Sequence, residues 1–211
     1  MAKIHEETAF FNFLREGKYL GPSLDNNEVN GVKAIINACG EANWPISWTA
    51  YALATAYHET AHTMQPIKEY GGPKYFTRMY DITGTRPKLA KDNGNTSPGD
   101  GAKYFGRGYV QLTWKNNYAK MEKELKIAGL VKNPDLALTC ENAARIMTYG
   151  MKEGRFTGHS LEDHLPRDCV ATLKQFVEAR RIINGTDKAV QIAEYAMHFQ
   201  DALTRGGWKA V

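Results

Sequence analysis

The sequence predicts a mainly α-helical fold, built as a single domain over residues 1–211. Hydrophobic residues recur with the period of a helix along most of the chain. Hydrophobic side chains make up 43% of the residues and charged side chains 24%, which are ordinary values for a globular protein. A single stretch rich in glycine and proline interrupts the helical pattern. A chain of this length can bury a substantial apolar core.

The first third of the chain predicts three helices. Apolar residues share one face in residues 6–16 and again in residues 26–39. A third helix is expected after Pro45, with Ser47 as its N-cap, and none of residues 42–57 is charged. This helix is apolar nearly all round, which is typical of a helix buried inside a domain.

The helical period is lost between residues 66 and 101. This stretch holds four of the 8 prolines and six of the 19 glycines. We therefore expect loop with a short hairpin, forming a loop-rich insertion over about 66–103. The helical period then returns in four segments, at residues 115–127, 141–152, 168–183 and 187–204.

Composition and charge exclude several classes of protein. The net charge of +4 and the pI near 8.8 are mildly basic, and the absence of a long Lys/Arg run argues against a nucleic-acid partner. No window resembles a membrane span or a secretory signal, so membrane insertion is not expected. The odd number of cysteines predicts free thiols in a reducing compartment, at Cys39, Cys140 and Cys169. Without coiled-coil heptads, a monomer is expected.

Glu59 is the first charged residue after the uncharged helix. It lies eleven residues, about three turns, beyond Trp48, so both side chains point to nearly the same face. Burial disfavours a carboxylate, and the last turn lies at the negative end of the helix dipole, so we expect the pKa of Glu59 to be raised. Such an acid can donate a proton to a leaving oxygen near neutral pH. A salt-bridged glutamate at a helix end is an equal alternative on this segment alone.

The run from His58 to His62 also fits the zinc pattern H-E-x-x-H. A zinc peptidase needs a third protein ligand, but the metzincin extension meets Gln65 and Lys68 where it requires glycine and histidine. Pro66 also ends the helix. We therefore keep a zinc peptidase as a weaker alternative and expect neither a metal nor an organic cofactor.

Three segments together resemble one enzyme family. The segment from Tyr104 to Trp114 reads YFGRGYVQLTW, and it resembles the signature Y-[YF]-G-R-G-x-x-Q-L-[ST]-W of family 19 glycoside hydrolases, the chitinase-like group that includes many bacteriophage endolysins. The run from His58 to Thr60 resembles the family's H-E-[ST], and residues 182–185 resemble its late I-x-N-G segment. The resemblance implies a lysozyme-like, chitinase-like fold that is mainly α, with two lobes around a substrate groove and at most a small β-hairpin.

The resemblance also implies roles for individual residues. Glu59 would be the general acid, and Thr113 would hold the attacking water. Amide and hydroxyl groups match sugar hydroxyls, and an aromatic ring offers apolar surface to a sugar face. The residues implied to bind the sugar or to orient its neighbours are His58, Tyr104, Arg107, Gln111, Asn117 and Asn184.

An inverting glycosidase needs a second carboxylate about 6.5–9.5 Å from the acid. The phage-type members have a short interval between the two acids, which implies Glu69, whereas the longer interval of the chitinases implies Asp81. We prefer Glu69 and keep Asp81 as the fallback. Lys68 beside Glu69, and Arg78 near Asp81, are expected to keep either carboxylate ionised.

The C-terminal helix departs from the chitinase pattern. Chitinases carry a supporting arginine there, whereas this chain has Gln191. We expect Arg107 or Arg181 to supply the missing charge.

The resemblance, together with the short interval from Glu59 to Glu69, implies a phage-type endolysin that hydrolyses the β-1,4 bonds of bacterial peptidoglycan strands by inversion. The resemblance implies a protein that accumulates in the host bacterial cytoplasm and reaches the cell wall through a separate pore-forming protein. A chitinase acting on N-acetylglucosamine polymers and a glycan-binding module without turnover stay open as alternatives.

Overall fold

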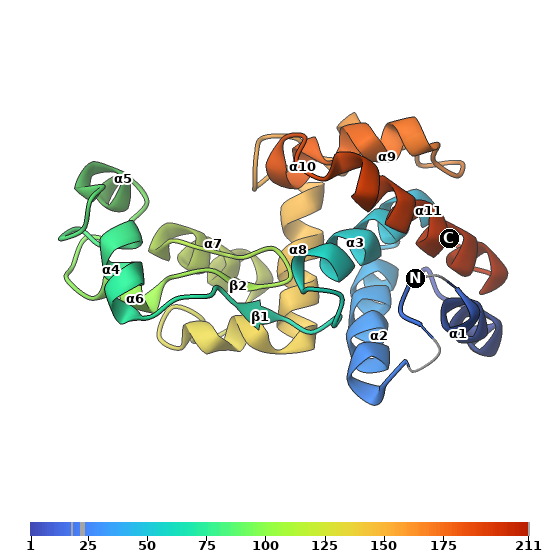
Figure 1. Ribbon diagram of the computed structural model, residues 1–211, viewed down its shortest axis with the longest axis horizontal. Coiled ribbons are helices and arrows are strands. Elements are labelled where there is room, and N and C mark those ends of the chain that lie inside the picture. The colour runs from blue at the N-terminus through green and yellow to red at the C-terminus, as the bar shows by residue number, and fades with distance from the viewer. Residues whose placement is uncertain (18, 22–23, 211) are drawn as a thin grey trace. The chain divides into compact units, whose positions relative to one another are not determined.

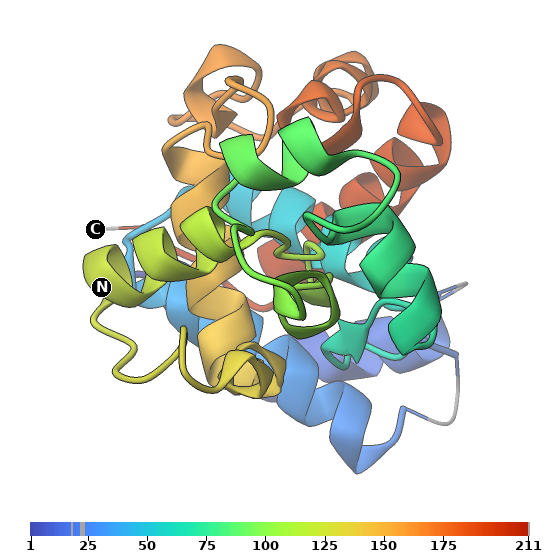
Figure 2. The same ribbon diagram turned by 90° about the vertical axis from the view of Figure 1, so that its left-hand side faces the viewer.

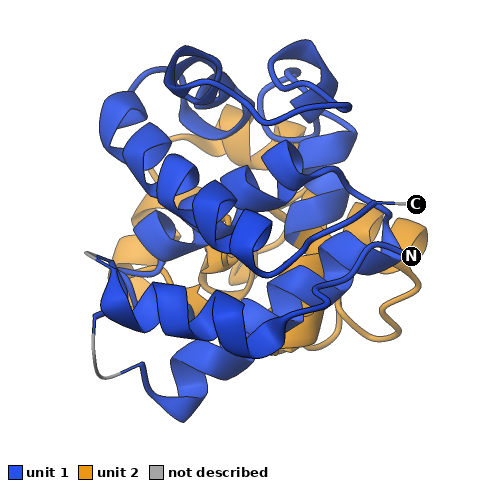
Figure 3. Ribbon diagram, turned by 90° about the vertical axis from the view of Figure 1, so that its right-hand side faces the viewer, with its two compact units in different colours: residues 1–65, 147–211 blue, residues 66–146 orange. Residues whose placement is uncertain are grey.

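A computed structural model describes residues 1–17, 19–21 and 24–210 of the chain (Figure 1). The chain divides into two compact units (Figure 3). Unit 1 comprises Met1–Gln65 and Met147–Val211, and unit 2 comprises Pro66–Ile146. One boundary follows Gln65, and the other falls inside helix α8, Cys140–Lys152. Within the described residues, no helix is long and apolar enough to cross a bilayer.

Unit 1 is built from helices. In chain order its elements are α1 (Glu7–Glu16), α2 (Asn26–Glu41), α3 (Ile46–Glu59), the second half of α8, η2 (Leu161–Asp163), α9 (Leu173–Ala179), α10 (Arg181–Asn184) and α11 (Ala189–Arg205). Helices α2 and α11 pack against α3, and α11 also contacts α1 and α9. Helix α3 therefore forms the centre of this unit.

Helix α3 is buried on all sides, as its uncharged sequence predicts. Every side chain from Ser47 to Tyr57 is buried. The helix begins at Ile46, with Pro45 at the cap position, so the prediction of Ser47 as N-cap is wrong. The Ser47 hydroxyl instead donates to the Pro166 carbonyl. The Pro45 carbonyl accepts the first intrahelical bond, from the Thr49 N–H, which places the start of the helix at Ile46.

A tight turn follows α3 and returns the chain to α2. The Thr60 hydroxyl donates to the Ala56 carbonyl at 2.7 Å and accepts the Met64 N–H at 3.1 Å. Gly31 of α2 faces this turn, and a Cβ atom on Gly31 would lie only 1.8 Å from the Met64 carbonyl oxygen. The close approach of α2 to the turn after Glu59 thus requires glycine.

Unit 2 consists of short elements joined by loops (Figure 2). They are β1 (Ile67–Lys68), α4 (Pro73–Tyr80), α5 (Pro87–Asp92), α6 (Asp100–Lys103), β2 (Arg107–Gly108), α7 (Lys115–Leu125), η1 (Pro134–Leu138) and the first half of α8. Strands β1 and β2 pair antiparallel, with Ile67 opposite Gly108 and Lys68 opposite Arg107. Helix α4 packs against α5 and α6, and β2 packs against η1.

The expected fold class is confirmed, because the described chain is mainly helical with one small antiparallel pair of strands. The predicted insertion over 66–103 is not simply loop, since it contains α4, α5 and α6. Two prolines explain the error. Pro73 and Pro87 occupy the first position of α4 and α5, where the missing N–H costs no hydrogen bond and the fixed φ suits a helix.

The helix expected over 168–183 is shorter and interrupted. It starts at Leu173 because Thr172 caps it, with reciprocal bonds between the Thr172 and Gln175 side chains and backbones. It breaks at Arg180, which separates α9 from α10. The other predicted helices lie within about two residues of their expected ends.

We predict that Gly31→Ala lowers the free energy of unfolding by about 1–3 kcal/mol, because the new methyl group overlaps the Met64 carbonyl. Urea denaturation followed by circular dichroism measures the change. Gly72→Ala is the matched control, since a Cβ atom there meets nothing within 4 Å. Equal effects of the two substitutions would contradict the close approach.

Candidate active site

The Glu59 carboxylate ends α3 and is paired with a buried arginine. Its side chain is 23% exposed, while that of Arg180 is only 2% exposed. Arg180 Nη1 donates to Glu59 Oε1 at 2.8 Å, and its Nε donates to the Asp187 carbonyl at 2.9 Å. The expected partial burial of Glu59 is present, together with a charge partner that was not predicted.

Arg180 is the arginine that supports Glu59, so the expectation of Arg107 or Arg181 is wrong. Arg181 points outward and pairs with Glu178 at 3.0 Å, with both side chains nearly half exposed. The sequence holds a signal for this difference. Arg180 lies four residues after the buried Phe176, a spacing that puts both side chains on one helical face. Arg181 lies five residues after Phe176 and is not on that face.

The two histidines of the zinc pattern do not share a helix face. Helix α3 ends at Glu59, and His62 lies beyond it with a positive φ of 73°. The His62 ring stacks on Tyr57, with centroids 4.3 Å apart. No group of three or more His, Cys, Asp or Glu residues suited to a metal occurs in the described part of the chain. Within the described residues, His58 and His62 are therefore not joined by a third ligand of the kind that a zinc peptidase needs.

His58 lies beside Glu59 in the last turn of α3. Its ring is 6.4 Å from that of Tyr195, measured between centroids. Burial lowers the pKa of His58 below its ordinary value, although the neighbouring Glu59 charge acts in the opposite direction. A neutral imidazole next to the carboxylate can exchange hydrogen bonds with a sugar hydroxyl.

In unit 2, Glu69 directly follows β1 and accepts two hydrogen bonds. The Tyr80 hydroxyl donates to Oε1 at 2.7 Å, and the Gly106 N–H donates to Oε2 at 3.1 Å. Burial and the Glu69 carboxylate raise the pKa of Tyr80 above its ordinary value, so Tyr80 remains a donor. Sequence reasoning did not identify Tyr80, since its role depends on α4, which was expected to be loop.

Three of the predicted site residues gather around Gly106. A Cβ atom placed on Gly106 would lie 2.8 Å from Gln111 Oε1, 3.1 Å from Glu69 Oε2 and 3.3 Å from Thr113 Oγ1. The Thr113 hydroxyl donates to the Gln111 carbonyl at 2.8 Å. The signature segment thus places an amide, a carboxylate and a hydroxyl at one point of unit 2, and glycine leaves room for all three.

Backbone strain occurs in or directly after two of the three segments of the resemblance. Ala61, His62 and Met64 after Glu59 have positive φ, and so do Gln111 and Trp114 on either side of Thr113. A positive φ is rare outside glycine and most unusual for a bulky residue such as tryptophan. Strain of this kind concentrates where a protein holds functional groups in place.

Two predicted sugar-binding residues belong to the interior instead. Tyr104 is 1% exposed, and its hydroxyl donates to the Val131 carbonyl at 3.1 Å, so it offers no surface to a sugar. Arg107 is 5% exposed; its Nε pairs with Asp135 at 2.8 Å, and its guanidinium stacks on Phe105. Both roles in substrate binding are therefore wrong, because these polar groups are already satisfied inside unit 2.

The two predicted asparagines are exposed. Asn117 lies in the first turn of α7 and donates to the Thr113 carbonyl at 2.8 Å, which links it to the Gly106 group. Asn184 ends α10 in unit 1, four residues after Arg180. Each side chain is accessible to a ligand within its own unit.

Asp81 is a structural carboxylate rather than a candidate base. It is 1% exposed, and its two oxygens accept four hydrogen bonds, from the Thr83 N–H and hydroxyl and from the Gly99 and Gly101 N–H groups. Burial alone would raise the pKa of Asp81, but these hydrogen bonds outweigh it and hold the pKa below its ordinary value. They also occupy the lone pairs that a base would need.

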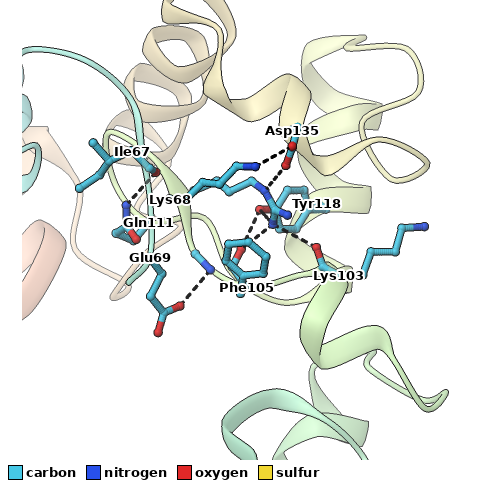
Figure 4. A network of polar contacts seen from close by, with 10 residues as sticks. Ile67, Lys68, Glu69, Lys103, Phe105, Gln111, Tyr118 and Asp135 are labelled. Carbon is cyan, nitrogen blue, oxygen red and sulfur yellow. Dashed lines mark hydrogen bonds and ion pairs between the residues drawn. The ribbon is translucent and has the colours of Figure 1, made fainter. Parts of the chain in front are cut away.

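The neighbouring cations do not pair with the two acids as expected. Lys68 Nζ pairs with Asp135 at 2.8 Å instead of with Glu69 (Figure 4). Successive residues of a strand point to opposite sides, which separates the Lys68 and Glu69 side chains. The donors to Asp81 are the amides and the hydroxyl named above, so Arg78 is not its partner.

The described fold is that of the family 19 chitinases. It is similar to chitinase C from Streptomyces griseus HUT6037, with 19% identity, a TM-score of 0.60, and an alignment that covers 95% of this chain and 77% of that one. A variant of chitinase C with one glutamate replaced by glutamine gives 20% identity and the same TM-score and coverage, 0.60, 95% and 77%.

A second enzyme, described as a bacterial family 19 chitinase, is similar over 98% of this chain and 97% of its own, with 19% identity and a TM-score of 0.56. At this level of identity the similarity concerns the fold. No family model and no curated protein sequence matches the chain.

We predict that Asp81→Asn destabilises the protein by about 1–3 kcal/mol at pH 7. The NH₂ group of the asparagine would face N–H and hydroxyl groups that now donate to the Asp81 carboxylate, so hydrogen bonds would be lost. A carboxylate with a depressed pKa stabilises the fold above its ordinary pKa of about 3.9, and this contribution is lost as the pH falls through the folded-state value. The deficit of the variant should therefore shrink below about pH 4.

Urea titrations at several pH values measure this difference. Asp92→Asn is the control, since the Asp92 carboxylate forms an exposed pair with Lys88, and its replacement should change stability by less than about 1 kcal/mol. A deficit of Asp81→Asn that is constant with pH would show that charge is not involved.

Proposed function

We propose that this protein is a glycoside hydrolase that cleaves the β-1,4 bonds of bacterial peptidoglycan by an inverting acid/base mechanism. The observation that carries the proposal is the Glu59–Arg180 pair, an acid at the end of a buried helix with a buried cation at 2.8 Å. The fold shared with family 19 chitinases and the group around Gly106 support it.

Glu59 is the general acid in this proposal. Its proton passes to the glycosidic oxygen as the bond from that oxygen to the anomeric carbon breaks, and Glu59 is left as a carboxylate. Arg180 stabilises that carboxylate through a charge-assisted hydrogen bond. His58, in the same turn, contacts the sugar beside the cleaved bond.

Glu69 is the general base. It takes a proton from water while the water oxygen forms a bond to the anomeric carbon from the opposite side, which inverts the configuration. Thr113 and Gln111, grouped with Glu69 around Gly106, hold the water and the sugar. Asn117 and Asn184 add hydrogen bonds to sugar hydroxyls.

The interval between the two acids favours peptidoglycan as the substrate. Glu69 follows Glu59 by ten residues, which resembles the phage-type enzymes more than the chitinases. Chitin is the second candidate substrate, and the similarity to enzymes described as chitinases supports it. As an endolysin, the protein would act as a monomer and reach the wall from the host cytoplasm through a separate pore-forming protein.

The test is digestion of purified Gram-negative peptidoglycan and of chitin oligomers, with reducing-end analysis and mass spectrometry of the products. We predict that the wild type releases reducing ends and that Glu59→Gln and Glu69→Gln lower the rate by at least about 100-fold. The polymer digested faster identifies the substrate class.

Asp81→Asn is the control for the base, and after correction for the folded fraction it should retain activity. Full cleavage by Glu59→Gln would refute the acid role, and release of peptides without reducing ends would refute glycosidase activity. Binding of glycan without any release would indicate a binding module.

We predict that Arg180→Gln lowers the rate by about 10–100-fold, because the carboxylate formed at Glu59 loses a charged hydrogen bond. Arg181→Gln is the matched control at the next residue and should leave the rate nearly unchanged. Arg180→Lys retains the charge and should recover part of the activity. If the pH dependence of Arg180→Gln matches that of the wild type, Arg180 has only a packing role.

A further inference from the structure

The net positive charge of the protein comes from unit 2. Residues 66–146 contain fourteen Lys and Arg against eight Asp and Glu, a net charge of +6, while the rest of the chain contains thirteen against fifteen, a net charge of −2. Residues 73–91 alone contain five Lys and Arg against a single acid, Asp81. The whole-chain value of +4 therefore conceals two units of opposite sign.

A hollow in this segment gathers cations and hydroxyl groups. Its lining includes Lys74 and Arg78 of α4 and the side chains of Thr77, Thr83 and Thr85, and no acidic residue lines it. Lys74 and Arg78 are exposed. Within the described residues, neither forms an ion pair with a carboxylate. They are one helical turn apart on α4, a spacing of about 5–6 Å between Cβ atoms.

The wall of the hollow is held rigidly. A Cβ atom on Gly84 would lie 2.3 Å from the Thr77 carbonyl and 2.5 Å from the Arg78 carbonyl, so the turn packs directly against the end of α4. The Thr85 N–H and hydroxyl both bond to the Arg78 carbonyl, at 2.9 and 3.0 Å. Since the oxygens of Asp81 are bound by Thr83, Gly99 and Gly101, its carboxylate is not free to pair with Lys74 or Arg78.

We propose that this hollow binds the carboxylate groups of the peptide stems that peptidoglycan carries along its glycan strands. Two cations without a competing acid select an anion, and the Thr77 hydroxyl adds a hydrogen-bond donor for its oxygens, since the hydroxyls of Thr83 and Thr85 already donate to Asp81 and to the Arg78 carbonyl. Chitin has no such carboxylates, so the hollow favours peptidoglycan. This inference rests on the proposed glycosidase function, because that function brings the protein to the glycan.

The test measures binding in the Glu59→Gln background, so that no strand is cut. Retention on intact Gram-negative sacculi is compared with retention on sacculi whose carboxyl groups have been amidated. In about 0.05 M salt, Lys74→Gln with Arg78→Gln should weaken binding to intact sacculi by about three- to tenfold. The loss should be small on amidated sacculi and in about 0.5 M salt.

Lys123→Gln with Lys132→Gln is the control, since it removes two exposed charges from the same unit outside the hollow and should lower binding less than about twofold. Equal losses in the two double variants would overturn the proposal in favour of general charge attraction. Equal binding to intact and amidated sacculi, with displacement by inorganic phosphate, would overturn it in favour of a phosphate site.

Catalysis is measured separately. The double variant at Lys74 and Arg78 with Glu59 intact should release reducing ends from amidated sacculi as fast as the wild type. If the wild type releases no reducing ends from any substrate, the proposed glycosidase function is refuted. The comparison of binding to intact and amidated sacculi still shows whether the hollow binds carboxylate groups.

Discussion

The burial of α3 on all sides is the constraint on which unit 1 depends. A helix surrounded by other helices cannot carry a charge in its middle without a large desolvation cost, so the first acid appears where the helix ends. That acid, Glu59, is still only 23% exposed and is paired with a cation. Arg180 is buried almost completely, and removal of either partner leaves the other charge desolvated. The ion pair that surrounds the candidate acid is therefore also part of the packing of unit 1.

Unit 2 holds its candidate base, Glu69, in place with little regular secondary structure. Its two strands are two residues each, and a network around Arg107 supplies the order that longer strands would give. Arg107 bonds to Asp135, to the Lys103 and Phe105 carbonyls and to Tyr118. Gly106, next to Arg107, exchanges bonds with Glu69 through its N–H and its carbonyl. A residue that resembles a substrate ligand in the sequence thus holds the strand on which the candidate base depends.

The sequence predicts elements whose signal is local and misses those that depend on tertiary packing. Helical periodicity located α1, α2, α7, α8 and α11 because each has an apolar face of regular spacing. The same reasoning treated Pro73 and Pro87 as breakers, since a proline that ends a helix and a proline that begins one look alike without the neighbouring structure.

The residues of the candidate site likewise fall into those that the sequence identified and those whose surroundings depend on tertiary contacts. Glu59, Glu69, Gln111 and Thr113 follow from the resemblance, whereas the burial of Tyr104 and Arg107 depends on partners at Val131 and Asp135, more than twenty residues away. Arg180 was missed because its partner lies 121 residues earlier in the chain.

The environments of the two acids support the proposed direction of proton transfer. In the proposed reaction Glu59 would change from neutral to negative, and Glu69 would change from negative to neutral. A fixed cation favours the first change and opposes the second. Glu59 has such a cation in Arg180, while the donors to Glu69 are the neutral Tyr80 hydroxyl and Gly106 N–H. The nearby cations Lys68 and Arg107 both pair with Asp135. The two acids therefore differ in their surroundings in the way that the proposed roles require, with a cation beside Glu59 and neutral donors beside Glu69.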